Sequence, residues 1–208
     1  MNNVKVVIFD FDGTVADSIP FIYYEVKKEL KEVGISEKEV GQIEKVGVSK
    51  FLKELNMSRI KMAWAAFKIQ KRLKKKIDRV AVFEGVESLL RDLQKDGFEL
   101  GIVTNNKKKT VEKFMKSNDL NLLSFVYGNF FLRRKVRKLE KAVKIAGAEK
   151  GRVVYIGDQK EDILDAKKVG LKSIGVTWGL SNFDELKKVG PDYIADSPEE
   201  IYDFLIRS

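Results

Sequence analysis

The chain of 208 residues contains neither cysteine nor histidine, and it has only three prolines. Without cysteine, a disulfide framework, a thiolate zinc site and a cysteine nucleophile are excluded. Without histidine, the usual general base, the Ser-His-Asp triad and the commonest transition-metal ligand are excluded. Acid–base chemistry must therefore come from carboxylates, lysine or tyrosine, and the oxygen ligands that remain favour a hard cation such as Mg²⁺ over zinc.

Long hydrophobic runs are also absent. No stretch reaches the roughly 18 apolar residues of a membrane span, and the short run 4–9 does not have the layout of a signal peptide. Hydrophobic residues make up 44% of the chain, which is typical of a globular domain and not of a disordered one. We therefore expect a soluble protein without a membrane partner, and the absence of cysteine favours the cytoplasm.

Positive charge is in excess, because 40 lysines and arginines face 31 acidic residues and give a net charge of +9. This balance favours anionic partners, which include both phosphate esters and nucleic acid. The densest basic run, residues 71–76, has no interleaved aromatic residues on which bases could stack. We interpret it as the solvated face of a helix, so that nucleic acid is not the favoured partner.

Short, continuously apolar and β-branched segments recur along the chain, as is typical of strands buried on both faces of a parallel sheet. Segments with helical periodicity separate them, and strand alternating with helix predicts crossover connections. The predicted fold class is therefore α/β, with a Rossmann-like core of three layers around a parallel sheet. The predicted strands are 4–9, 98–103, 125–127, 152–156, 172–176 and 192–194.

One segment interrupts this alternation, since residues 17–79 show helical periodicity and no predicted strand. We predict an α/β core formed by residues 1–16 and 81–208, with an inserted helical domain at residues 17–80. Within the insertion, Trp64, Phe67 and Leu73 are interpreted as one apolar stripe facing a core. An insertion directly after the first strand emerges at the sheet edge where open α/β folds bind ligands, as a lid would.

The first predicted strand ends in the segment Asp10-Phe11-Asp12-Gly13-Thr14. A lone Asp-Gly pair is typical of a turn. In an extended segment, however, residues i and i+2 face the same side, so that Asp10 and Asp12 can address one small region. Gly13 then allows the chain to turn sharply.

Two other predicted strands also end in polar groups. Thr104 and Asn105 follow the second strand, and Asp158 follows the fourth, with Asp162 four residues later at the start of a helix. The carboxyl ends of parallel strands meet at one edge of a sheet, which is where such folds place their sites. We expect these side chains and the two aspartates of the first strand to converge there.

This set of motifs resembles the haloacid dehalogenase superfamily, in its phosphatase branch with a helical cap after the first strand, as in phosphoglycolate phosphatases. The resemblance covers the whole chain. The first motif of the family matches residues 10–14, the second matches Thr104, and the fourth matches Asp158 and Asp162.

The third motif of the family is a lysine, which typically opens the helix that leads to the fourth motif. Lys135 is the best match to this position. Three basic neighbours compete with it for this assignment: Arg133, Arg134 and Lys138.

The resemblance implies a phosphatase in which Asp10 attacks phosphorus and forms an aspartyl phosphate. It implies that Asp12 donates a proton to the leaving oxygen and later accepts one from water. Thr104, Asn105 and Lys135 are the implied phosphate-binding residues.

The resemblance also implies a Mg²⁺ site. Its expected ligands are Asp10, the backbone carbonyl of Asp12, and Asp158, because several carboxylates cannot receive a phosphate dianion unless their charge is neutralised. Asp162 is expected to orient the waters of the metal or Lys135.

The expected substrate is a small phosphorylated metabolite. Phosphoglycolate, sugar phosphates and nucleotides all remain open, and Lys50 lies in a segment that resembles the specificity loop of related caps. A phosphomutase would retain the same core residues, and a nucleic-acid-binding or regulatory protein could retain the same shell. A dehalogenase would need neither Asp12 nor Asp158. The sequence predicts no oligomeric state.

Overall fold

The computed structural model describes residues 4–32, 36, 58–128 and 135–207. Contacts within the chain divide it into two compact units: Met1–Asp17 with Val80–Ser208, and Ser18–Arg79. The sequence analysis placed these two divisions between residues 16 and 17 and between residues 80 and 81. The first unit holds all of the described strands, and the second is helical where it is described. None of the described helices combines the length and the apolar character that crossing a membrane requires.

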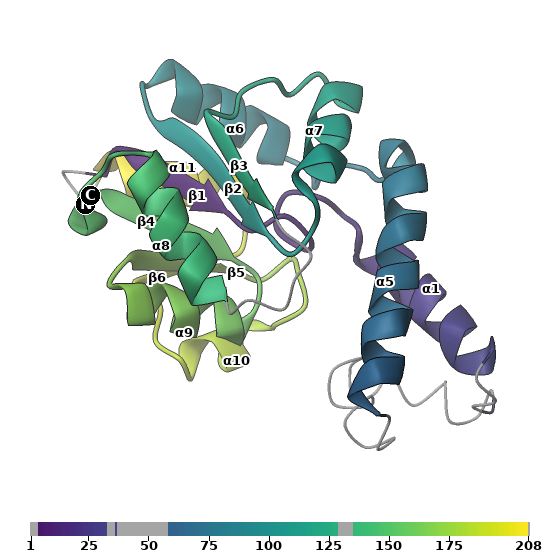
Figure 1. The fold of residues 1–208 in the computed structure, drawn as a ribbon. Coiled ribbons are helices and arrows are strands. Elements are labelled where there is room, and N and C mark those ends of the chain that lie inside the picture. The colour runs from purple at the N-terminus through teal and green to yellow at the C-terminus, as the bar shows by residue number, and fades with distance from the viewer. Residues whose placement is uncertain (1–3, 33–35, 37–57, 129–134, 208) are drawn as a thin grey trace. The chain divides into compact units, whose positions relative to one another are not determined.

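The first unit is built around a parallel sheet, in which the described strands follow the order β3-β2-β1-β4-β5-β6 (Figure 1). All pairings between neighbours are parallel. The predicted α/β fold class is confirmed. The strands are β1 Val6–Phe9, β2 Glu99–Thr104, β3 Phe125–Gly128, β4 Val153–Gly157, β5 Lys172–Val176 and β6 Tyr193–Ala195.

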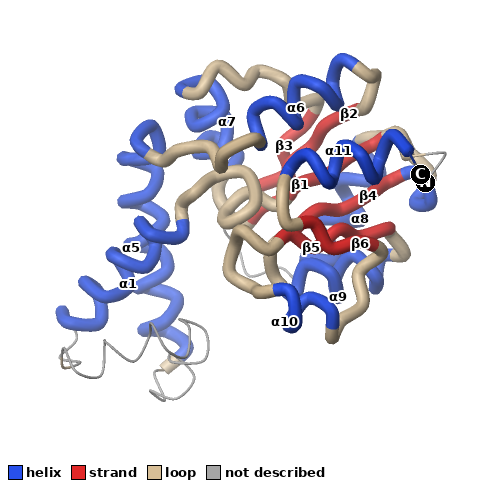
Figure 2. The backbone as a smooth tube through the Cα atoms, turned by 180° about the vertical axis from the view of Figure 1, so that it is seen from behind, coloured by secondary structure: helices blue, strands red, loops and turns tan. Residues whose placement is uncertain are grey.

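Helices cover both faces of this sheet and complete three layers. α8 and α9 lie on one face, and α6 and α11 lie on the other, as the front and back views show (Figures 1 and 2). α7 lies beside β3, and α10 beside α9. The helices are α6 Val86–Lys95, α7 Lys108–Ser117, α8 Lys135–Ile145, α9 Lys160–Val169, α10 Phe183–Lys187 and α11 Pro198–Arg207, with a short 3₁₀ turn, η2, at Lys150–Arg152.

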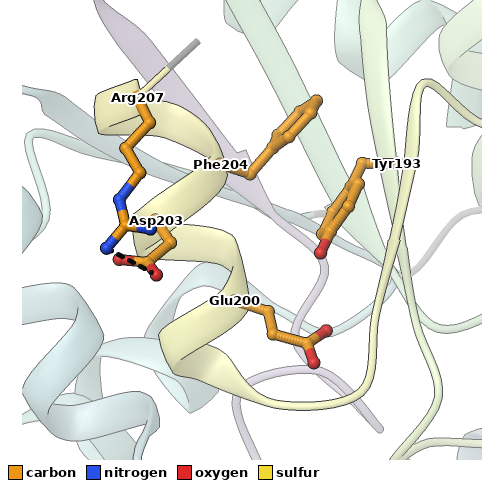
Figure 3. Close-up of a pocket in the computed structure, with 5 residues that line it drawn as sticks. All are labelled: Tyr193, Glu200, Asp203, Phe204 and Arg207. Carbon is orange, nitrogen blue, oxygen red and sulfur yellow. Dashed lines mark ion pairs between the residues drawn. The ribbon is translucent and has the colours of Figure 1, made fainter.

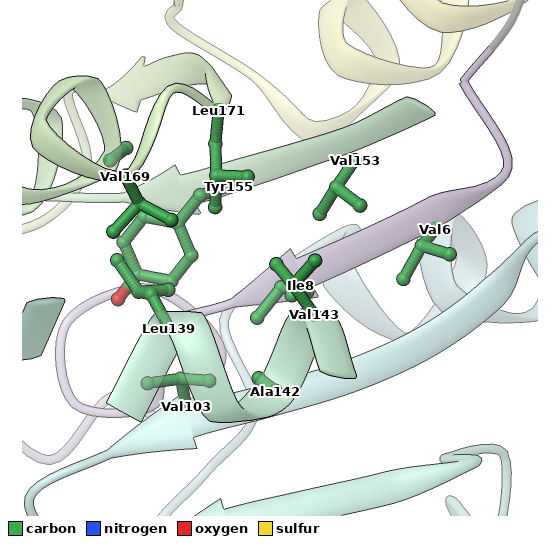
Figure 4. Close-up of a cluster of buried hydrophobic side chains, with 11 residues drawn as sticks. Val6, Ile8, Val103, Leu139, Ala142, Val143, Val153, Tyr155, Val169 and Leu171 are labelled. Carbon is green, nitrogen blue, oxygen red and sulfur yellow. The ribbon is translucent and has the colours of Figure 1, made fainter. Parts of the chain in front are cut away.

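β1 is the central strand, and its four residues are all buried. Alternate side chains of a strand point to opposite faces, so Val6 and Ile8 pack beneath α8, against Leu139 and Val143 (Figure 4). This burial on both faces explains why the sequence of β1 is continuously apolar instead of alternating. This burial also fixes the end of β1, and with it the position of Asp10, which directly follows the strand.

The helical unit contains α1, Ile19–Glu32, and α5, Arg59–Lys76, followed by the 3₁₀ turn η1, Ile77–Arg79. α1 and α5 lie side by side (Figures 1 and 2). Arg72 forms ion pairs with Glu25 at 2.8 Å and Glu29 at 2.6 Å, and Lys68 binds Glu29 at 3.0 Å. Both glutamates are buried. Buried carboxylates are stable only when paired, so this network joins the two helices.

The basic run 71–76 takes two different roles on α5. Arg72 belongs to the ion-pair network, whereas Lys71, Lys74, Lys75 and Lys76 are exposed to solvent. This arrangement agrees with the interpretation of the run as a solvated helix face.

The apolar stripe predicted on this helix is wrong in part. Leu73 is buried, but the exposed fractions of Trp64 and Phe67 are 60% and 39%, and their rings stack on each other with centroids 5.8 Å apart. Nine residues separate Trp64 from Leu73, which is about two and a half helical turns, so the two side chains lie on opposite sides of α5. The two aromatic residues therefore belong to the exposed side.

The chain leaves the core and returns to it at paired segments. The backbone N–H of Asp17 donates to the carbonyl of Ala81 at 2.9 Å, and Ala16 forms an antiparallel bridge with Val82. The inserted residues therefore start and end at one place in the core, a few residues after Asp10.

Replacing Arg72 with methionine should destabilise the protein, because Glu25 would stay buried without its ion pair to Arg72, and Glu29 would keep only its ion pair with Lys68 among the described contacts. We expect a loss on the order of 2 kcal/mol, since removing one partner of a buried ion pair leaves an uncompensated charge. Thermal or urea unfolding followed by circular dichroism measures the change. The exposed neighbour Lys71, replaced in the same way, should change stability by less than about 0.5 kcal/mol. Equal effects of the two substitutions would contradict a stabilising network.

Candidate active site

Three neighbouring strands of the sheet end in the polar residues that the sequence analysis singled out. Asp10 follows β1, Thr104 is the last residue of β2, and Asp158 follows β4. β1 pairs with both β2 and β4, so these three residues lie at one edge of the sheet. This edge is where the order of the strands reverses direction, the position at which open α/β folds bind ligands.

A cluster of buried carboxylates lies at this edge. Asp10, Asp158 and Asp162 each offer a carboxylate oxygen, and these oxygens all lie within 4.8 Å of one another. Asp162 belongs to the first turn of α9 and reaches back towards the end of β4. All three residues are at least 95% buried.

Lys135, the first residue of α8, brings positive charge to this cluster. Its Nζ lies 2.8 Å from Oδ2 of Asp10 and also bonds Oδ1 of Asp162. The same ammonium group lies 5.5 Å from the centre of the buried Tyr155 ring. Lys135 therefore joins the end of β1 to the start of α9.

Burial and mutual repulsion shift the titration of these groups. Burial, together with the charges of Asp10 and Asp162, raises the pKa of Asp158 to about 8. Burial also raises the pKa of Asp162 to about 6 and that of Asp10, although Lys135 opposes both shifts. Burial opposes the charge of Lys135, but Asp10 and Asp162 outweigh it and raise the pKa of the lysine well above its usual value. The cluster is short of positive charge.

Asp12 lies at the turn that follows β1. Gly13 adopts a φ of +82°, a conformation that side chains disfavour, and it allows the chain to reverse directly after Asp12. Oδ2 of Asp12 accepts a hydrogen bond of 2.5 Å from Nδ2 of Asn106. The Asp12 side chain is half-buried, in contrast to the fully enclosed Asp158.

The two adjacent asparagines after β2 have different surroundings. Asn106 is buried and reaches Asp12, and its backbone N–H donates to Oγ1 of Thr104 at 3.0 Å. Asn105 is exposed, and its Oδ1 accepts from Nζ of Lys138 at 2.6 Å.

Lys138 lies one turn after Lys135 on α8, and it is buried. Its Nζ donates to the carbonyl of Thr104 at 3.0 Å as well as to Asn105. Burial and the nearby Lys135 lower the pKa of Lys138 to about 8. Lys135 and Lys138 thus have different partners among the described contacts: Lys135 contacts the acidic cluster, and Lys138 contacts the segment after β2.

The segment after β5 encloses Asp158, a role that the sequence analysis did not assign. The backbone N–H of Leu180 donates to Oδ2 of Asp158 at 2.9 Å, and Thr14 donates to Oδ1 at 3.3 Å. Nε1 of Trp178 donates to the carbonyl of Thr14 at 3.1 Å. Gly179 packs so tightly that a Cβ there would meet the side chain of Asp158 and lie 2.5 Å from the carbonyl of Gly13.

The structure brings four of the sequence-predicted residues together, and it adds one residue that the sequence analysis did not name. Asp10, Asp158, Asp162 and Lys135 are in direct contact or within 4.8 Å. Asn106, whose amide reaches Asp12, was not among the residues that the sequence analysis named. The sequence held no signal for this choice, because two adjacent asparagines in a turn point in different directions and the backbone angles decide which of them reaches Asp12.

The assignment of the third motif to Lys135 agrees with its contacts, because its ammonium group binds Asp10 and Asp162, whereas that of Lys138 donates to Thr104 and Asn105. Arg133 and Arg134, the two arginines that precede Lys135, lie outside the described residues.

A separate shallow pocket of about 320 Å³ lies between β6 and α11 (Figure 3). It is lined by Tyr193, Glu200, Asp203, Phe204 and Arg207. The rings of Tyr193 and Phe204 stack at 4.3 Å. Tyr193 begins its strand, so the pocket is not at the strand ends that carry the acidic cluster.

Comparison with known families identifies the chain. The model of the haloacid dehalogenase-like hydrolases matches residues 7–176, which include the whole acidic cluster and Lys135. The chain belongs to this family. The resemblance seen in the sequence motifs is therefore confirmed.

Relatives of this haloacid dehalogenase-like hydrolase match nearly all of its length. A phosphoglycolate phosphatase of Synechococcus elongatus is 28% identical over 202 residues, which cover 95% of each chain. The pyrophosphatase PpaX of Halalkalibacterium halodurans is 27% identical over 219 residues, which cover 97% of each chain. The crystal structure of a predicted phosphatase from Clostridium acetobutylicum superimposes with a TM-score of 0.88 at 26% identity, covering 99% of this chain and 100% of that one.

The raised pKa of Asp158 predicts how the metal-free hydrolase responds to pH. The folded pKa of about 8 exceeds the ordinary value of 3.8, so the folded state holds the proton more tightly than the unfolded state, and this stabilisation is lost as pH rises through 8. In chelator, Asp158→Asn should therefore raise the melting temperature more at about pH 8.5 than at about pH 5. A difference in melting temperature between the variant and the wild type that does not change with pH would contradict the raised pKa of Asp158.

Gly179→Ala should destabilise the hydrolase, because the new methyl group would overlap the side chain of Asp158 and the backbone of Gly13. We expect a loss of about 1–3 kcal/mol, as for other overpacked sites. Gly151→Ala provides a matched control, since a Cβ at Gly151 meets nothing within 4 Å. Urea unfolding of the two variants measures the difference. Similar stabilities would show that the segment after β5 can move away from Asp158.

Proposed function

We propose that this hydrolase is a Mg²⁺-dependent phosphatase that transfers a phosphoryl group from a small phosphorylated metabolite to Asp10 and then to water. The observation that carries the proposal is the ion pair of Asp10 with Lys135 inside the buried acidic cluster at the end of β1. A carboxylate held by an ammonium group, with no histidine or cysteine in the chain, is the nucleophile that this site offers.

In the first step, an oxygen of Asp10 attacks phosphorus, and the bond from phosphorus to the leaving alkoxide breaks. The carboxyl group of Asp12, two residues later, donates a proton to that leaving oxygen. In the second step, Asp12 accepts a proton from a water molecule, which attacks phosphorus and releases inorganic phosphate from Asp10. One difficult displacement is thereby divided into two easier ones.

Thr104, Asn105 and Lys135 are the proposed phosphate-binding residues. The Thr104 hydroxyl accepts a hydrogen bond from Asn106, so its own hydrogen can be donated to a phosphoryl oxygen. Lys135 supplies a fixed positive charge where negative charge gathers on the transferring group. Its contacts with Asp10 and Asp162 support this placement, because they hold the ammonium group beside the nucleophile.

The residues present fit a hard divalent cation. The acidic cluster offers oxygen donors within 4.8 Å of one another, and burial with mutual repulsion raises the pKa of all three carboxyl groups. A cation would relieve that repulsion. We propose that Asp10, the backbone carbonyl of Asp12, and Asp158 hold Mg²⁺, which would neutralise the charge of the incoming phosphate. Asp162, which binds Lys135, would orient that lysine.

The proposed substrate class follows the names of the relatives, which include phosphoglycolate phosphatases and a pyrophosphatase. We propose further that the helical insertion, residues 17–80, acts as a cap that selects the ester. Its point of attachment supports this role, since both of its ends join the core at the paired segments that follow Asp10. Lys50, which the sequence analysis considered for specificity, lies outside the described residues.

Release of inorganic phosphate from a panel of phosphorylated metabolites tests the proposed function. The wild-type protein should be active with Mg²⁺ and inactive with chelator, and Asp10→Asn should lower turnover by at least about a thousandfold, as expected for loss of a nucleophile. Radiolabelled phosphate should remain on acid-quenched wild-type protein and not on the variant.

Asp184→Asn is the matched control for this test, because Asp184 is an exposed aspartate in α10, and its replacement should leave turnover unchanged. Turnover by Asp10→Asn close to that of the wild type would contradict the assigned nucleophile. Formation of an isomeric phosphate ester without release of inorganic phosphate would identify a phosphomutase, which uses the same core residues.

A further inference from the structure

We propose that Asn106 is a positioning residue that holds the Asp12 carboxyl group in place for proton donation to the leaving oxygen. The inference rests on the proposed function and deepens it. It starts from the hydrogen bond that Nδ2 of Asn106 donates to Oδ2 of Asp12, across a separation of 94 residues in the chain. This contact joins the ends of β1 and β2 beside the acidic cluster.

Asn106 is suited to this role because its own position is fixed. The residue is buried, its backbone N–H is bound to Oγ1 of Thr104, and Gly128 packs against its carbonyl so closely that a Cβ there would lie 2.5 Å away. A side chain held by several contacts can orient a partner that is itself less enclosed. Asp12 is such a partner, since it is only half-buried at a turn.

Lys138 anchors the same segment from the side of α8. Its buried ammonium group donates to the carbonyl of Thr104 and to the side chain of Asn105, the two residues directly before Asn106. The segment 104–106 is therefore held by Lys138 on one side and bound to Asp12 on the other. These contacts thereby fix the position of the Asp12 carboxyl group relative to the proposed phosphate-binding residue Thr104.

The consequence for the reaction depends on the leaving group. An alkoxide is a poor leaving group and needs the proton of Asp12 as the bond to phosphorus breaks, whereas p-nitrophenolate leaves readily without it. A displaced Asp12 should therefore slow the first step for alkyl phosphates and have little effect for p-nitrophenyl phosphate. A general loss of structure or of phosphate binding would slow both.

The test compares kcat/KM for an alkyl phosphate and for p-nitrophenyl phosphate, since kcat/KM reports the steps up to release of the alcohol. Asn106→Ala should lower kcat/KM by at least about tenfold for the alkyl ester, part of the effect of a general acid, and by less than about threefold for p-nitrophenyl phosphate. Asn121→Ala is the matched control, because it removes the amide of an exposed asparagine that has no assigned role in the site. It should affect the two substrates equally.

A double-mutant cycle with Asp12→Asn shows whether Asn106 acts through Asp12. In the Asp12→Asn background, Asn106→Ala should produce no further discrimination between the two substrates, because the group that it positions is already gone. Circular dichroism melting tests whether each variant is folded. If Asn106→Ala is unfolded, Asn106→Gln replaces it, and this variant, which keeps the amide donor, should recover part of the lost activity.

Two sets of results would overturn the inference. Equal losses for both substrates in Asn106→Ala, or discrimination that persists in the Asp12→Asn background, would show that Asn106 acts by another route. Either result would leave the proposed phosphatase intact, because the wild-type protein would still be active. Absence of wild-type activity, or full activity in Asp10→Asn, would instead reject the proposed function.

Discussion

The contact of Lys135 with two buried carboxylates is the interaction on which the site depends. Three buried acidic residues, Asp10, Asp158 and Asp162, lie together near the end of β1, and burial alone would favour their neutral forms. Lys135 binds Asp10 and Asp162 directly, so at least these two carboxylates have a cationic partner within the protein. Asp158 does not share this contact among the described residues, and burial together with the charges of Asp10 and Asp162 raises its pKa to about 8. The pKa values of Asp10 and Asp158 both stay raised, and the proposed divalent ion would lower them.

The sheet makes this concentration of charge possible. β1, β2 and β4 are buried on both faces, and their side-by-side pairing gives their ends no freedom to separate when carboxylates repel. Hydrogen bonds from the segment after β5 and from the turn at Gly13 then enclose Asp158. The stability of the apolar core is thus used to hold an arrangement of charges that would be unstable by itself.

The fold was predictable because a strand buried on both faces must be continuously apolar, and β1 and β4 show that pattern plainly. The acidic residues of the site were predictable for the same reason, since each directly follows such a strand or opens the next helix. The contact of Asn106 was not, because the direction of each side chain in a turn depends on backbone angles that adjacent asparagines do not reveal. Trp64 shows a second limit: apolar residues on a helix indicate a core only when their spacing keeps them on one side.

The pairing of Asp17 with Ala81 affects how far the sequence and length of the helical unit can change without disturbing the core. Hydrogen bonds within the core hold both ends of the inserted segment together. In terms of connectivity, the insertion is therefore equivalent to a long loop between two paired segments. Loop tips tolerate added or altered sequence, and the entropy of closing a loop rises only slowly with its length. We therefore expect the residues between these ends to tolerate changes in length and sequence while the strands that carry Asp10 and Asp158 keep their register.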